Sequence, residues 1–255
     1  MLEIDRWALA ELDLVIEKVL KAYEAYEFHT VYHTLYNFAT VTLSARYFDI
    51  VKDRLYTYAP RNQARRSGQT ALFRIVDALA RMLAPILVFT ADEIWENLGG
   101  GPDSLSSVHL ALFPELVGGD QSSLLDNWTR LFEIRDEVLR ALEEARIAKR
   151  IGSSLEASVE LKSDSTTYEF LKSYEDQLRY LFIVSEVKLT KGEGIIAHEG
   201  RSGLSGVSEI AITRAEGQKC ERCWNYSTHV GESERYPTVC ERCVAALEEI
   251  EREEA

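Results

Sequence analysis

Residues 220–243 read CERCWNYSTHVGESERYPTVCERC, and this stretch decides how the C-terminal part of the chain folds. It contains two Cys-x-x-Cys pairs, which are separated by sixteen residues. Two residues between cysteines form a tight turn that aims both sulfurs at one point. Two such turns supply the four thiolates of a tetrahedral zinc site. The stretch therefore predicts a metal site with four ligands: Cys220, Cys223, Cys240 and Cys243.

A zinc ion at this site is expected to be structural, because four protein ligands leave no open position for water. Two disulfides, an iron centre and four free thiols are the alternatives. The chain has no other cysteine, whereas a secreted disulfide protein spreads its cysteines across the fold. The clustering favours one zinc ion and a reducing compartment, so we expect a cytoplasmic protein. His229 lies between the pairs and is expected to be a spectator.

Upstream of the cysteines, helical periodicity dominates. Apolar residues recur every three or four positions over residues 4–26 and again from residue 28 to about residue 56. A third helix from about residue 69 is apolar almost all round, which is typical of the middle of a bundle. Ala84-Pro85 should interrupt it, and Thr90 to Glu93 resembles a capping box that would start the next helix. A long charged helix should run from about residue 122 to 150 and stop at Gly152.

The pattern changes after Gly152. Alternating apolar and polar residues predict strands at 157–162, 184–189 and 209–213, with a helix over 166–182. Residues 191–208 are rich in glycine and serine and are expected to form a loop. The predicted fold is mainly α, with a helical domain at 1–150, a small α/β domain at 151–214 and a zinc-binding knuckle at 215–255.

The formal net charge of −13 argues against indiscriminate nucleic-acid binding, because a phosphate backbone would be repelled on average. Basic residues nevertheless gather in three places, which would let the protein bind one nucleic acid in one orientation: Arg61, Arg65 and Arg66; Arg146, Lys149 and Arg150; and Arg214, Lys219 and Arg222. No apolar run approaches the eighteen or so residues of a membrane span, so we expect no membrane association.

Several stretches of the chain resemble one family, the bacterial-type isoleucyl-tRNA synthetases. Five stretches are similar to the anticodon-binding bundle of class I synthetases for branched aliphatic amino acids: residues 3–7, 26–38, 49–56, 83–87 and 90–95. Residues 151–157 resemble the segment that follows this bundle. The ending, from Glu216-Gly217 through Trp224 to Cys243, resembles the terminal zinc finger of the isoleucyl enzyme. Valyl enzymes typically end in a coiled coil instead.

The resemblance implies that the full enzyme uses ATP and magnesium to ligate isoleucine to its tRNA. Neither active-site signature of class I enzymes occurs here, and the editing domain and the first bundle helix are missing. We therefore expect an inactive, monomeric fragment that binds isoleucine tRNA. In the family, the arginine and tryptophan at the positions of Arg222 and Trp224 are the candidates for anticodon contacts, so these two are the tRNA-binding candidates here. Alternatively, Trp224 simply packs over the zinc site.

Weaker candidates for contacts to the tRNA stem or backbone lie in the second helix and the loop after it: Tyr47, Lys52, Arg54, Arg61, Arg65 and Arg66. An internal ion pair, such as Asp49 with Lys52, explains several of them without RNA. His29 and His33 lie four residues apart and are expected to be packed. A zinc module that reads duplex DNA and a stand-alone, synthetase-derived tRNA-binding protein are the rival functions.

Overall fold

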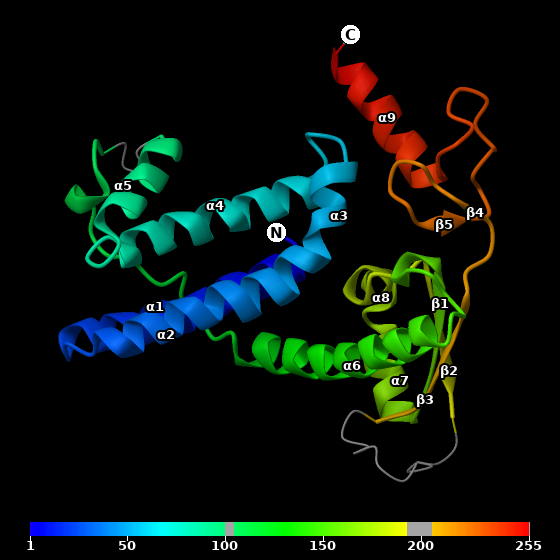
Figure 1. Cartoon of the computed structure of the whole chain (residues 1–255), viewed down its shortest axis with the longest axis horizontal. Helices are drawn as coiled ribbons and strands as arrows, with labels where there is room; N and C mark the ends of the chain where they lie inside the picture. Colours follow the sequence, from blue (N-terminus) through cyan, green and yellow to red (C-terminus); the bar gives the residue numbers. More distant parts are fainter. Residues whose placement is uncertain (100–104, 193–205, 255) are drawn as a thin grey trace. The chain divides into compact units, whose positions relative to one another are not determined.

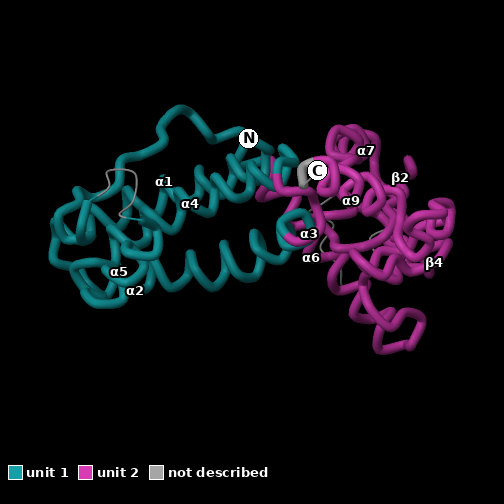
Figure 2. Tube along the Cα trace, turned by 90° about the horizontal axis from the view of Figure 1, so that it is seen from above, with its two compact units in different colours: residues 1–55, 61–126 teal, residues 56–60, 127–255 magenta. Residues whose placement is uncertain are grey.

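The computed structural model describes residues 1–99, 105–192 and 206–254 of the chain (Figure 1). The fold is mainly helical, as predicted, and the small sheets found among the described residues lie in the C-terminal half. The chain divides into two compact units, residues 1–55 with 61–126 and residues 56–60 with 127–255 (Figure 2). Whether residues 1–150, 151–214 and 215–255 fold separately stays a prediction. Within the described part, every helix is too short or too polar to span a lipid bilayer.

The first unit is built from helices that turn back on one another. Helix α1 (Glu3–Glu24) packs against α2 (Phe28–Asn37) and against α4 (Gln63–Leu83), which in turn packs against α5 (Val88–Asn97). A π-helical stretch (Phe38–Phe48) and α3 (Asp49–Thr57) continue α2 without a break. The predicted long second helix is therefore confirmed.

The face of α1 that the periodicity marks as apolar is the face that packs. Its buried positions include Ile4, Trp7, Ala8, Leu12, Val15 and Val19. Burying such a side chain contributes about 1.5–3 kcal/mol before the cost in conformational entropy. Asp5 lies on the same turn and is also fully buried, which the apolar pattern does not predict.

The second unit combines a long helix with a small mixed sheet. Helix α6 (Ser122–Ile147) precedes β1 (Ala157–Ser163), and α7 (Ser165–Lys172) and α8 (Glu175–Phe182) connect β1 to β2 (Glu186–Lys191). Strand β1 lies in the centre of the sheet, parallel to β2 and antiparallel to β3 (Val207–Arg214). Buried Arg135 of α6 donates to the carbonyl of Leu181 at 2.9 Å, which holds α6 against α8.

The knuckle follows β3. It consists of a two-stranded hairpin, β4 (Gln218–Lys219) paired with β5 (Tyr226–Ser227), and the terminal helix α9 (Glu241–Glu254). Its small core contains the four cysteines with Val230 and Val239, and Tyr236, Val244 and Leu247 pack against this cluster. So few apolar residues cannot form a sufficient core, and small domains of this kind usually need a metal or disulfides.

Three predicted helix boundaries are wrong. Helix α4 begins at Gln63 rather than at about residue 69, because the side chain of Asn62 accepts from the amide of Ala64 and caps the helix there. Helix α5 begins at Val88, so Thr90 lies inside it and does not cap it. Helix α6 ends at Ile147, and Lys149, two residues later, has the left-handed φ of 57°. Gly152 is therefore not its stop.

Three further expectations differ from the structure. Phe73 of α4 is 42% exposed, so this helix does have an open side. His29 and His33 are exposed on α2 rather than packed, and the ring of His33 meets that of Tyr32 edge to face. The three predicted strands are confirmed. The single helix expected over 166–182 is instead two helices, α7 and α8, which are separated by residues 173–174. Most of the expected 191–208 loop lies outside the described residues.

Candidate metal centre and nucleic-acid interface

The backbone of the knuckle folds so that both Cys-x-x-Cys pairs form turns. The amide of Trp224 donates to the carbonyl of Cys220 at 2.9 Å, and the amide of Val244 donates to that of Cys240 at 2.9 Å. Gly217 opens the hairpin at φ 87°, and a Cβ there would lie 2.2 Å from the backbone of Ser227. Only glycine fits this position, because the two strands approach too closely for any side chain.

The four cysteine sulfurs converge on one point. Cys220, Cys223, Cys240 and Cys243 are all buried, and their Sγ atoms all lie within 4.8 Å of one another. The Sγ atoms of Cys223 and Cys240 are 3.6 Å apart. A zinc ion bound at about 2.3 Å by four sulfurs would place them about 3.8 Å apart. The four thiols are unbridged, and their arrangement fits a tetrahedral zinc ion.

The cysteine thiols also interact with one another. Hydrogen bonds from the thiols of Cys240 and Cys243 lower the pKa of Cys223, whereas the hydrogen bond with Cys223 raises the pKa of Cys240 to about 11. A zinc ion would bind the four cysteines as thiolates and release their protons. His229, exposed and 2.9 Å from the Oε1 atom of Glu232, is not part of the cluster.

Arg222 contacts both the cysteine cluster and Thr57, a residue far away in the sequence. Its Nη1 atom is 3.8 Å from the Sγ atom of Cys243, and the same atom donates to the carbonyl of Thr57. Four thiolates around one zinc ion carry a net negative charge, which a guanidinium at this position offsets. The guanidinium is therefore held in place by contacts within the chain.

Trp224 points away from the small core. Its side chain is 60% exposed, and its backbone has the left-handed φ of 65°, which is rare for a non-glycine residue. The ammonium of Lys219 lies 5.5 Å from the centre of its ring. Packing over the zinc site would bury this ring, so the exposure favours a role in contacts outside the chain.

The weaker tRNA-binding candidates separate into two kinds. Tyr47 and Arg54 are buried in the first unit, where both donate to the carboxylate of Asp5, so their prediction as surface contacts is wrong. The Nζ atom of Lys52 pairs with Asp49 at 2.6 Å, as the alternative explanation expects. Arg61 and Arg66 are exposed and Arg65 is half-buried, and their contact with RNA stays a prediction.

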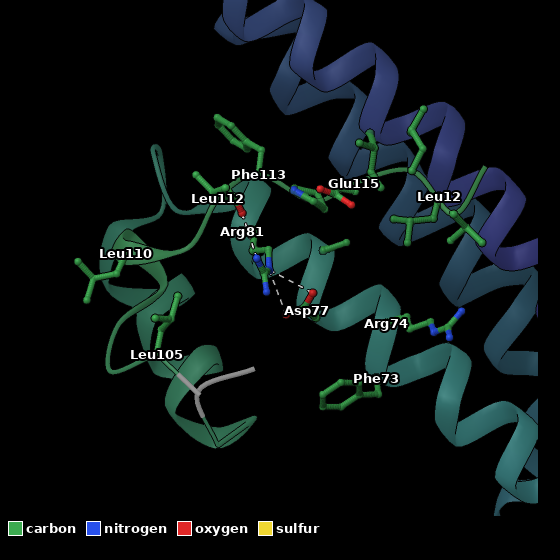
Figure 3. Close-up of a pocket in the computed structure, with 15 residues that line it drawn as sticks. Leu12, Phe73, Arg74, Asp77, Arg81, Leu105, Leu110, Leu112, Phe113 and Glu115 are labelled. Atoms are coloured by element: carbon green, nitrogen blue, oxygen red, sulfur yellow. Dashed lines mark hydrogen bonds and ion pairs between the residues drawn. The ribbon is translucent and has the colours of Figure 1, made fainter. Parts of the chain in front are cut away.

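A groove of about 820 Å³ lies in the first unit, between α1, α4 and the segment 105–117. Its rim is apolar, with Leu110, Leu112 and Phe113 exposed (Figure 3). Arg81 of α4 points into it and donates to the carbonyl of Leu112 at 3.1 Å and to Asp77 at 3.2 Å. The lining indicates no particular ligand chemistry, so the knuckle is the candidate site.

Comparison with known proteins agrees with this choice. Residues 5–161 match the family model "Anticodon-binding domain of tRNA ligase", and residues 217–246 match "Zinc finger found in FPG and IleRS". The matched zinc finger contains all four clustered cysteines, which supports a structural zinc ion.

Similar curated proteins carry the name "Isoleucine--tRNA ligase". The protein from Moorella thermoacetica is 44% identical over 98% of this chain, and that from Syntrophotalea carbinolica is 45% identical over 97%. The protein from Symbiobacterium thermophilum is 46% identical over 97% of the chain. The chain spans only 26–27% of the length of these relatives. The family match covers more than half of the chain, which therefore belongs to the anticodon-binding domain family of tRNA ligases.

Proposed function

We propose that this chain recognises the anticodon region of isoleucine tRNA as part of a longer isoleucine–tRNA ligase. The family match to residues 5–161 and the name of the similar proteins support this proposal. Activation of isoleucine with ATP and magnesium would take place in parts of the polypeptide outside this chain. The chain alone is expected to catalyse no isoleucine-dependent exchange of pyrophosphate with ATP.

The observation that carries the proposal is the exposed ring of Trp224, which directly follows a zinc ligand. Reading an anticodon requires a surface on which an unpaired base can stack, because RNA sequence is read mainly from splayed, single-stranded bases. The zinc-bound turn would fix the ring before RNA arrives, so little conformational entropy would be lost on binding. We propose that Trp224 stacks on one base of the anticodon loop.

We propose that Arg222 contributes from the same turn. Its Nη1 atom contacts the carbonyl of Thr57 and the Sγ atom of Cys243, so its guanidinium is held by contacts within the chain. A fixed guanidinium fork recognises a base edge or a phosphate with less loss of side-chain entropy than a free one. A base contact would make Arg222 sensitive to the anticodon sequence, whereas a phosphate contact would weaken binding to all tRNAs alike.

The experiment compares the parent chain with Trp224→Ala for binding to isoleucine tRNA. The variant is expected to bind about 5- to 150-fold more weakly, which corresponds to the ~1–3 kcal/mol of one base–aromatic stack. Tyr226→Phe is a control in the same hairpin, because it removes a hydroxyl and keeps the ring. Zinc content is measured in every variant, since a collapsed knuckle would mimic a lost contact.

Two results would contradict the proposal. One is a zinc-loaded Trp224→Ala variant that binds isoleucine tRNA as tightly as the parent does. The other is a parent chain that prefers duplex DNA to tRNA, which would favour a DNA-reading zinc module. The unbridged cysteine cluster supports our further proposal that the protein works in the cytoplasm. We also propose that the chain binds one tRNA as a monomer.

A further inference from the structure

Residues 56–60 comprise the last two residues of α3 and the three that follow, and they pack with the second unit (Figure 2). Arg222 of the knuckle donates to the carbonyl of Thr57 within this segment. Ala59 is 1% exposed, so the middle of the segment is firmly packed. Tyr56, at its start, is 82% exposed. An aromatic side chain is therefore displayed on a backbone that the knuckle holds in place.

A second arginine holds the same segment. The guanidinium of Arg242 lies 5.1 Å from the ring centre of Tyr58 and 6.0 Å from that of Tyr180. The hydroxyls of the two tyrosines are 3.0 Å apart, and burial raises the pKa of Tyr58 to about 12. Cation–π contacts of this kind contribute about 0.5–2 kcal/mol.

The two arginines occupy equivalent places in the repeated Cys-Glu-Arg-Cys motif, where Arg222 precedes Cys223 and Arg242 precedes Cys243. The backbone of each arginine would be fixed by the zinc-binding cysteine that follows it in the sequence. Each also reaches the segment 56–60, one through a backbone carbonyl and the other through a ring. A metal-loaded knuckle would therefore hold this segment through both arginines.

We propose that Tyr56 is a second base-stacking side chain, which extends the RNA-binding surface of Trp224 onto the segment 56–60. This inference rests on the proposed function and names a contact that the family resemblance did not supply. Tyr56 is adjacent to Thr57, and Trp224 is two residues from Arg222, so one hydrogen bond links the two aromatic positions. Their bases would belong to the same single-stranded loop.

The basic side chains of the knuckle favour a negatively charged partner, and RNA is such a partner. Lys219 lies 5.5 Å from the ring centre of Trp224. Arg222 contacts Thr57, which follows Tyr56, and Arg242 lies over the ring of Tyr58. These three cations belong to a protein whose net charge is −13. Aromatic rings alternating with basic groups are the combination that binds single-stranded nucleic acid without reading every base. An acidic protein that binds RNA needs such a local concentration of positive charge.

The experiment measures binding of isoleucine tRNA, at two salt concentrations, to the parent chain, Tyr56→Ala, Tyr56→Phe and Trp224→Ala. Tyr56→Ala should weaken binding about 5- to 150-fold with the salt dependence unchanged, because stacking releases no counterions. Tyr56→Phe keeps the ring and should bind within about twofold of the parent. Tyr26→Ala is the matched control, since Tyr26 is 79% exposed but belongs to the first unit.

The outcomes separate this inference from the proposed function. If Trp224→Ala weakens binding and Tyr56→Ala does not, Tyr56 is no stacking residue and the proposed function stands. If Tyr26→Ala weakens binding as much as Tyr56→Ala does, the effect is not specific to the segment and the inference is overturned. If the parent chain binds no tRNA, both fail. Circular dichroism and zinc content confirm that each variant is folded before its binding is compared.

Discussion

At the scale of single residues, the first unit is organised around a buried carboxylate. Asp5 of α1 is fully buried and accepts from the hydroxyl of Tyr47 at 2.6 Å. It also accepts from Arg54 and from Ser67, so three parts of the chain meet at one side chain. A buried charge is tolerated only when it is paired and hydrogen-bonded, and this one is both.

Replacing Asp5 with Asn should therefore destabilise the first unit strongly. The guanidinium of Arg54 would remain buried without its counter-charge, and breaking such a pair typically costs about 3–5 kcal/mol. Glu17→Gln is the control, because Glu17 pairs with Lys21 on the surface of the same helix and should leave stability unchanged. Urea unfolding followed by circular dichroism measures both. Equal stability of the two variants would mean that the cluster is not a structural centre.

At the scale of the elements, the end of α6 shows how a helix can stop without glycine. The amide of Lys149 donates to the carbonyl of Arg146, and the amide of Arg150 donates to that of Ala145. This is a Schellman arrangement, and it requires the left-handed φ of 57° at Lys149. The strain of a side chain in this conformation is about 1–2 kcal/mol.

Lys149→Gly should stabilise the protein, because glycine adopts the left-handed conformation without strain. Part of the gain is lost to the greater freedom of glycine in the unfolded chain, so the expected increase is about 0.5–1 kcal/mol. Ala148→Gly, one residue earlier and not at a positive φ, should lower the stability instead. Thermal unfolding of both variants checks the opposite signs. A destabilised Lys149→Gly variant would contradict this account of the helix end.

The elements also show where the sequence is informative. Apolar periodicity locates α1 to within two residues at each end, because its buried stripe is regular. It misses the start of α4, since residues 61–68 are polar and the signal there is one capping side chain, that of Asn62. It also misses the buried positions of Tyr47 and Arg54, because their burial depends on Asp5, far away in sequence.

At the scale of the whole molecule, the clustering of the four cysteines was predictable because the repeated Cys-x-x-Cys motif is local. Its geometry follows from spacing, and the structure brings all four sulfurs together. Trp224 as a tRNA contact, by contrast, rests on the family resemblance and stays a prediction. The exposed position of Tyr56 was not predictable. It depends on contacts between Arg222 and Arg242 of the knuckle and residues 57 and 58, which lie more than 160 positions away in the sequence.

Because the chain divides into two compact units, we expect loss of the metal to leave the free energy of unfolding of the first unit unchanged. The purified chain should contain about one zinc ion per molecule. Cys240→Ser should lose it and increase hydrogen exchange in residues 217–246, because the knuckle has too small a core to fold without metal. Exchange in α1 and α4 should stay as in the parent. Iron in place of zinc, or loss of the melting transition of the first unit, would contradict this prediction.

The most direct test of the central claim is the affinity of the zinc-loaded chain for isoleucine tRNA and for the same tRNA with a changed anticodon. An anticodon reader that uses Trp224 should bind the correct tRNA more tightly by at least about fivefold, since each lost base contact costs ~1–3 kcal/mol. The tRNA body is identical in the two measurements, so contacts to the stem and the phosphates cancel. Equal affinity for the two tRNAs would contradict the claim that this chain recognises the anticodon.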